Sequence, residues 1–149
     1  MKNSRSRMIV ALVVLVVVTA GTALAQSVNV LLKVEIPFSF VVGQKTLSAG
    51  EYEIRPANKV NKDVLWIKKL DSSAAACVIT FGPSGKRRQA GPYLLFNRYG
   101  DQYFLSQLWT ESDQVGRQAP KTAEEKELIQ AGKPKSAGAW PEVVLLQIK

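Results

Sequence analysis

Residues Val28 to Val42 read VNVLLKVEIPFSFVV, and every even-numbered residue in this stretch is apolar. The odd-numbered residues are mixed, so the pattern has the period of two that is typical of a β-strand with one buried face. Most of the apolar residues are β-branched or aromatic, which suits a half-buried pleated surface. Pro37 lies within the stretch and has no N–H for a strand ladder, so we expect the strand to bend or change partners there.

Further strand-like stretches follow, each bounded by residues that favour turns. They are Thr46–Leu47, Glu51–Ile54, Val64–Leu70, Ala76–Phe81, Tyr93–Arg98, Tyr103–Trp109 and Trp140–Ile148. Short strands with turns at roughly ten-residue intervals are typical of sandwiches and barrels. We therefore predict a single all-β domain, an antiparallel sandwich or barrel of about seven to eight strands.

The runs YLLFNR and YFLSQLW lie on either side of Tyr99–Gln102 and are predicted to form a hairpin. A two-residue Gly-Asp loop suits a tight turn because glycine adopts a positive φ without steric cost. This register places Phe96 opposite Leu105, whereas a three-residue loop would pair it with Phe104.

Residues Thr122 to Glu125 have the pattern of a capping box, which marks the start of a helix. A glycine and a proline after residue 131 end the helical pattern. Leu128 and Ile129 are its only large apolar residues. We therefore predict one short C-terminal surface helix, at about residues 122–131, that packs by one edge.

The first 25 residues have the features of a secretory signal peptide. A basic start precedes an apolar run from Met8 to Ala20, interrupted by one threonine, and an A-x-A cleavage site at Ala23–Ala25. We expect cleavage near Ala25, leaving residues 26–149 as one domain in the periplasm, at the cell surface or outside the cell. The alternative is an uncleaved membrane anchor, because the apolar stretch approaches the ~20 residues that span a bilayer.

The amino-acid composition argues against an enzymatic or cofactor-binding function. The net charge is +8, with 20 basic and 12 acidic residues, and there is no histidine. Removal of residues 1–25 would take away three basic residues and leave +5, a balance that favours solubility and anionic surfaces. Without histidine the chain lacks the usual general base and the commonest metal ligand. We therefore expect a protein that is not an enzyme and binds no cofactor.

Cys77 is the single cysteine, so it cannot form an internal disulfide. It lies in the strand-like run AACVITF. We predict that it is a buried, small apolar side chain. The alternative is a thiol that is available to another chain.

Residues Gly82 to Gly91, GPSGKRRQAG, form a basic loop. The spacing is wrong for a phosphate-binding loop, and Arg87 stands where a hydroxyl residue would hold Mg²⁺. Lys86, Arg87 and Arg88 remain as candidate ligands of an anionic surface, such as an acidic polysaccharide or phospholipid head groups. The alternative is a solvated hairpin tip, and we expect no specific binding of nucleic acid.

Aromatic residues near polar groups form a second candidate site, a stacking platform for sugars. They are Trp66, Tyr93, Tyr99, Tyr103, Trp109 and Trp140. Tyr99 lies in the predicted turn and is expected to be the most exposed, so we place the candidate glycan site at Tyr99, Asp101 and Trp109. The alternative is that strand aromatics belong to the core, which we expect for Trp66, Tyr103 and Trp109.

Two pairs of carboxylates, Glu51/Glu53 and Glu111/Asp113, are each two residues apart. A glycosidase needs two carboxylates on either side of its substrate, ~5 Å or ~6.5–9.5 Å apart, and neither pair lies in a supporting motif. Asp101, Glu111 and Asp113 also lack the ligand spacing of a calcium loop. We therefore assign no catalytic and no metal-binding residue.

Two segments resemble a group of small, exported, uncharacterised bacterial β-rich proteins. They are IPFSFVVGQKTLSAGEYEI, from Ile36 to Ile54, and NRYGDQYFLSQLW, from Asn97 to Trp109. The resemblance covers most of the chain after residue 25, in the same order, and ends in the Lys/Glu-rich helix. It implies a single exported domain and brings no activity, ligand or catalytic residue with it.

Three functions remain open. The first is a non-enzymatic exported binding or structural β-domain, with an unknown ligand. Its N-terminal strand offers a route to self-association by pairing in another subunit's sheet, although we expect this strand to be internal because its apolar pattern continues past Pro37. The other two are a carbohydrate-binding or carbohydrate-active protein and a small barrel that carries an apolar ligand.

Overall fold

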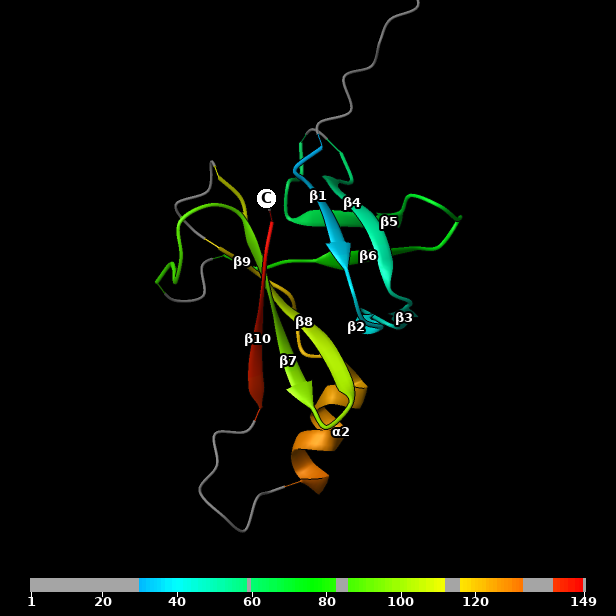
Figure 1. Cartoon of the computed structure of the whole chain (residues 1–149), viewed down its shortest axis with the longest axis vertical. Helices are drawn as coiled ribbons and strands as arrows, with labels where there is room; N and C mark the ends of the chain where they lie inside the picture. Colours follow the sequence, from blue (N-terminus) through cyan, green and yellow to red (C-terminus); the bar gives the residue numbers. More distant parts are fainter. Residues whose placement is uncertain (1–29, 59, 83–85, 112–115, 133–140, 149) are drawn as a thin grey trace, which may run out of the picture.

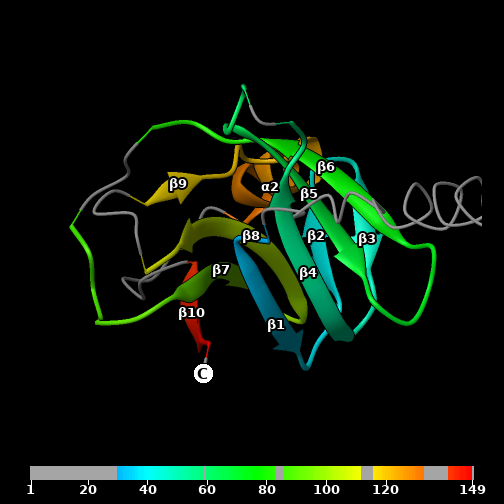
Figure 2. The ribbon, with the colours of Figure 1, turned by 90° about the horizontal axis from the view of Figure 1, so that it is seen from above.

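The computed structural model is a sandwich of two β-sheets with one short helix (Figures 1 and 2). It describes residues 30–58, 60–82, 86–111, 116–132 and 141–148. The strands are β1 (Leu32–Ile36), β2 (Phe40–Val42), β3 (Lys45–Leu47), β4 (Gly50–Pro56), β5 (Val64–Lys69), β6 (Ala75–Ile79), β7 (Tyr93–Tyr99), β8 (Gln102–Trp109), β9 (Arg117–Gln118) and β10 (Glu142–Gln147). Sheet A has the order β1-β4-β5-β6, and sheet B has the order β10-β7-β8-β2-β3 with β9 beside β8. The predicted all-β sandwich is confirmed, and the sheets do not close into a barrel.

The chain passes from one sheet to the other at Pro37. Strand β1 pairs antiparallel with β4 in sheet A, whereas β2 pairs antiparallel with β3 and parallel with β8 in sheet B. The predicted change of partners at this proline is therefore confirmed. Strand β1 pairs with β4 of its own chain, as expected, and forms an edge of sheet A.

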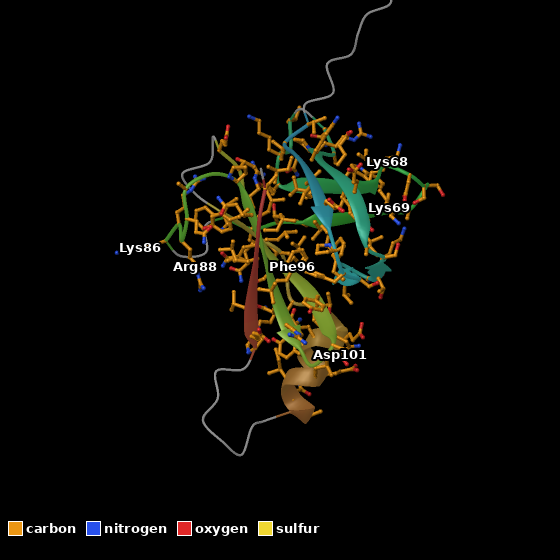
Figure 3. The ribbon with its side chains drawn as sticks, viewed as in Figure 1. Lys68, Lys69, Lys86, Arg88, Phe96 and Asp101 are labelled. Atoms are coloured by element: carbon orange, nitrogen blue, oxygen red, sulfur yellow. The ribbon has the colours of Figure 1, made fainter. Side chains whose placement is uncertain are left out.

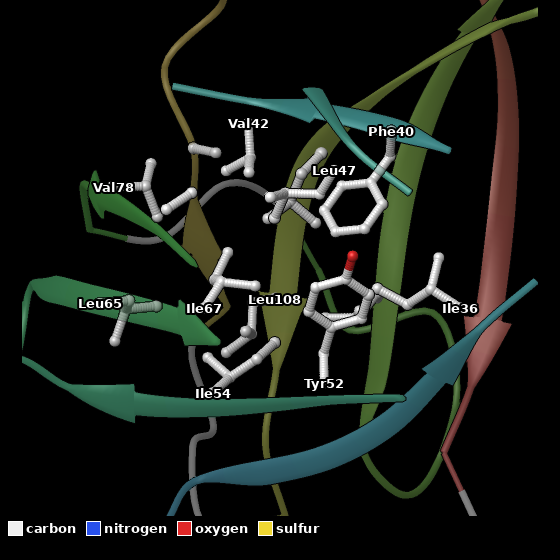
Figure 4. Close-up of a cluster of buried hydrophobic side chains, with 14 of the residues drawn as sticks. Ile36, Phe40, Val42, Leu47, Tyr52, Ile54, Leu65, Ile67, Val78 and Leu108 are labelled. Atoms are coloured by element: carbon white, nitrogen blue, oxygen red, sulfur yellow. The ribbon is translucent and has the colours of Figure 1, made fainter. Parts of the chain in front are cut away.

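The inner faces of the two sheets form the main core (Figure 4). Phe40 stands at its centre and makes edge-to-face contacts with Tyr52 of sheet A and Phe96 of sheet B, at 5.3 and 5.5 Å between ring centroids. Ile36, Ile54 and further aliphatic side chains pack around these rings. Each fully buried large side chain contributes about 1.5–3 kcal/mol, so this cluster holds the sheets together.

The hairpin of β7 and β8 has the predicted register, with Phe96 opposite Leu105. A bulge shifts the register between Leu95 and Phe96, so that Ser106 on β8 is the extra residue. Because of this extra residue, Leu105 and Leu108 both face the main core although they are three positions apart. The sequence pattern did not indicate the bulge.

Helix α2 (Ala123–Ala131) begins as predicted. The Thr122 hydroxyl accepts a hydrogen bond from the Glu125 backbone N–H at 3.0 Å, which is the capping contact expected of this sequence. Leu128 and Ile129 pack on an apolar cluster of the outer face of sheet B. The helix therefore covers one end of that sheet, as Figure 1 shows near the turn of β7 and β8.

Some predictions lie outside the described residues. The expected signal peptide, residues 1–25, is among them, as are Asp113 and Trp140. In the part of the chain that the structure does describe, no helix is long and apolar enough to cross a membrane. Strand β9, at Arg117–Gln118, is not among the strand-like stretches that the sequence predicts.

Candidate functional site

Exposed apolar side chains gather along β5 and β6 of sheet A. The described residues include six large apolar side chains that are exposed to solvent, and five of them lie between positions 60 and 81. These five are Val60, Trp66, Leu70, Ile79 and Phe81. Ile79 and Phe81 are each 59% exposed and Trp66 is 40% exposed. Large apolar groups concentrated on one part of a surface indicate a place where another molecule binds.

Outward-facing residues of β5 and β6, among them Trp66 and Ile79, form two rows across the strands. Trp66 lies opposite Cys77, and Val64 lies opposite Ile79. Hydrogen bonds of the ladder run from Lys69 N–H to Ala74 O and from Thr80 N–H to Asp63 O, so these two pairs are hydrogen-bonded. Because hydrogen-bonded and non-hydrogen-bonded pairs alternate along antiparallel strands, both rows are non-hydrogen-bonded pairs. In such pairs the two side chains lie closest together. We call Val64, Trp66, Cys77 and Ile79 the apolar strip.

The exposure of Cys77 and Trp66 contradicts two predictions. Cys77 is exposed rather than buried, and Trp66 lies on the outer face rather than in the core. The segment 76–81 has apolar residues on both faces, so its periodicity alone does not decide which face is inside. Strand β6 packs closely on the turn between β2 and β3, where a Cβ added to Gly43 would lie only 3.2 Å from the Cys77 carbonyl oxygen. The smaller Ala76 and Val78 fill the inner side there.

The rest of the outer face of sheet A is charged but balanced. Lys33, Glu53 and Lys68 stand side by side across β1, β4 and β5, and Arg55 lies 3.9 Å from the Glu53 carboxylate. With Glu35 and Glu51, this face carries three basic and three acidic residues on β1, β4 and β5. The opposite charges of Lys33, Glu53 and Lys68 on neighbouring strands stabilise the sheet, whereas Glu35 lies opposite Glu51 as a pair of like charges.

The basic loop is a connection between the two sheets, not a hairpin tip, since it joins β6 of sheet A to β7 of sheet B. Its three cations are not equivalent. Arg87 is half-buried and donates to the Gln89 and Gly91 carbonyl oxygens at 2.9 and 2.5 Å, whereas Lys86 and Arg88 are exposed. An anionic surface would therefore meet two cations here, not three.

The candidate glycan residues do not form one site. Tyr99 is 4% exposed and Trp109 is 1% exposed, so the expected exposure of Tyr99 is wrong and neither ring offers a free face. Tyr99 lies at the turn of the hairpin and Trp109 at its far end, roughly 20 Å away along the strand. Asp101 is exposed in the turn, where it lies 3.9 Å from Arg98. Figure 3 places Asp101 well away from Lys86 and Arg88.

Trp109 belongs to a small cluster on the outer face of sheet B. Its ring stacks on Tyr93 with 5.6 Å between the centroids, and Leu95 and Leu145 complete the cluster. Gly116 lies directly over the indole, because a Cβ at this position would be 2.2 Å from Trp109 Cε2. Trp109 is thus a core residue, which is the alternative stated for the strand aromatics.

Glu125 is a buried carboxylate that sequence analysis treated only as part of a helix start. It is 1% exposed, and its Oε1 accepts hydrogen bonds from Asn97 Nδ2 at 2.9 Å and from the Tyr99 hydroxyl at 3.1 Å. Burial raises the pKa of Tyr99, and the nearby Glu125 raises this pKa further. The three side chains tie α2 to β7, so we assign them a structural role.

The paired carboxylates do not converge on a site. Glu51 and Glu53 lie on the outer face of β4, among the balanced charges of sheet A, and Glu111 is exposed. Within the described ranges, no three cysteine, aspartate or glutamate side chains come together in a way that would hold a metal ion.

Comparison with protein families, with curated proteins and with solved structures found no match for this chain.

Proposed function

We propose that this chain is a non-enzymatic, exported binding domain whose binding face is the apolar strip of sheet A together with Phe81. One observation carries the proposal: Trp66, Ile79 and Phe81, three of the six exposed large apolar side chains in the described part of the chain, lie on or just beyond the neighbouring strands β5 and β6. Single exposed apolar side chains are ordinary on protein surfaces, whereas several on neighbouring strands indicate a binding site.

The energetics favour a macromolecular partner. Full burial of an exposed large apolar side chain is worth about 1.5–3 kcal/mol, and covering Trp66, Ile79 and Phe81, which are 40–59% exposed, would contribute roughly half of that for each. Buried tryptophan is a common anchor of protein interfaces. The three side chains lie on β5, at the end of β6 and just beyond it, so a partner meets a surface that the sheet has already organised.

Export is part of the proposal because of residues 1–25. Their basic start, apolar run and A-x-A site are those of a secretory signal. The interior supports binding at the surface rather than carriage of an apolar ligand, since Phe40, Tyr52 and Phe96 fill the space between the sheets.

The test is a binding experiment with exported proteins. The chain is immobilised and exposed to the exported-protein fraction of the organism that produces it, and retained proteins are identified by mass spectrometry. Any partner is then purified, and its affinity is measured by calorimetry. The double variant Trp66→Ser/Ile79→Ser should lose the partner, whereas the control Val143→Ser, which alters an exposed apolar residue on β10, should retain it. Equal binding by the double variant and the control would contradict the proposal.

A further inference from the structure

The apolar strip has the chemistry and the arrangement of a surface that pairs with a copy of itself. We propose that two copies of this chain associate face to face through β5 and β6, with the two-fold axis running along these strands and between them. The inference rests on the proposed function, because it names the partner of that binding face.

The balance of charge on sheet A favours an uncharged partner surface. The residues of β1, β4 and β5 that face outward carry three positive and three negative charges. Lys33 and Lys68 flank Glu53 in register, and Arg55 lies 3.9 Å from the same carboxylate. A polyanion or an anionic membrane would find no excess of cations here. A second copy of the chain carries an apolar strip of the same size, flanked by equal numbers of positive and negative charges.

The register of β5 and β6 selects the symmetry axis. In a two-fold interface the same patch contacts itself. An axis between β5 and β6 and parallel to them places Trp66 against the partner's Cys77, and Ile79 against the partner's Val64. The charged residues of β1 and β4 then lie outside the contact. An axis across the strands at Trp66 and Cys77 would instead bring Arg55 onto the partner's Arg55, a repulsive contact.

This arrangement predicts a weak, non-covalent dimer. Two sheets pack about 10 Å apart face to face, and the two Cys77 residues lie on opposite sides of the axis. Their Cα atoms are then further apart than the roughly 4.4–6.8 Å that a disulfide requires. The strip spans two strands, so each copy buries less than the ~800 Å² of a standard interface. We expect association in the micromolar range or weaker.

Sedimentation equilibrium over a wide concentration range, with and without a reductant, tests the dimer. The full chain is expressed from Met1 in a bacterium, and the protein is purified as the cell processes it, with or without residues 1–25. The wild-type chain and the Val143→Ser control should show the same monomer–dimer equilibrium, and alkylation of Cys77 should slow as concentration rises. Trp66→Ser and Ile79→Ser should each weaken association by at least about tenfold. Both variants change exposed side chains, and near-UV circular dichroism verifies their fold.

Three results would overturn the inference. A wild-type chain that stays monomeric at every concentration has no such dimer. A dimer that persists in both serine variants uses another surface, and one that disappears on reduction is held by Cys77. If the wild-type chain is monomeric but the serine variants still lose an identified exported partner, the proposed binding face stands without self-association. If the serine variants keep both self-association and partner binding, both proposals are wrong.

Discussion

Trp66 and Cys77 lie directly opposite each other on β5 and β6, with both side chains on the outer face of sheet A. The indole is therefore the cross-strand neighbour of the only thiol in the chain. Non-hydrogen-bonded pairs of this kind bring side chains within contact distance. The relationship makes the thiol a reporter for the face on which we place binding.

Cys77 should react with an alkylating reagent in the folded, dilute chain. We expect a rate within about tenfold of that in denaturant, because the side chain is exposed. The matched control carries Cys77→Ser together with Val78→Cys, which moves the thiol to the next position, where Val78 is 3% exposed. That thiol should be protected until the chain unfolds. Mass spectrometry of timed samples gives both rates, and equal protection of the two thiols would contradict the outward placement of Cys77.

Gly116→Ala should destabilise the fold by about 1–3 kcal/mol, because the new methyl group overlaps the Trp109 indole. Urea unfolding followed by tryptophan fluorescence measures the change. Gly82→Ala is the control, since a Cβ there meets no atom within 4 Å. Replacing a glycine in open space is neutral or stabilising by up to about 1 kcal/mol. Equal effects of the two substitutions would show that Gly116 does not pack on the ring.

Glu125→Ala should cost about 1–3 kcal/mol, because it leaves the Asn97 amide and the Tyr99 hydroxyl without their buried acceptor. Glu125→Gln should cost less, since the amide oxygen can accept the same two hydrogen bonds. Glu124→Ala alters the exposed neighbour, which accepts from Gln102, and should change stability by less than about 0.5 kcal/mol. Chemical denaturation of the three variants tests this order. A larger loss of stability in Glu124→Ala than in Glu125→Ala would contradict the structural role assigned to Glu125.

Stability should fall as pH rises above about 10, because the pKa of Tyr99 is raised in the folded state. Below pH 10 the phenol is neutral in both the folded and the unfolded state, so its contribution is fully present there. Above pH 10 the unfolded chain releases a proton that the folded chain retains, and stability falls by up to about 1.4 kcal/mol per pH unit for one such group. Burial also raises the pKa of Tyr52, which adds to the slope.

Tyr99→Phe should therefore make the alkaline loss of stability shallower. Urea midpoints between pH 8 and pH 12 provide the comparison, over a range chosen around the ordinary tyrosine pKa of about 10. Leu128→Ala serves as the control, because it weakens the packing of α2 without removing a titrating group. An unchanged slope in Tyr99→Phe would show that this phenol ionises equally well in the folded chain.

Local chemistry was sufficient to predict much of the fold. The alternation from Val28 to Val42, broken by a proline without an N–H, predicted a strand that changes partners at Pro37, and β1 and β2 do lie in different sheets. The capping box at Thr122 predicted the start of α2. The Gly-Asp turn predicted the register that pairs Phe96 with Leu105. In each case the deciding interaction lies within a few residues along the chain.

The candidate site depended on contacts between distant parts of the chain. Segment 76–81 is apolar on both faces, so only the packing of β6 on the turn between β2 and β3 decides that Ala76 and Val78 face inward and Cys77 and Ile79 outward. Likewise, the acceptor role of Glu125 requires α2 to lie on β7. The sequence by itself determined most of the strands, the hairpin turn, the helix start and the absence of histidine. Tertiary packing alone decided which apolar residues the core could hold and which it left at the surface, because the volume available inside is set by both sheets together.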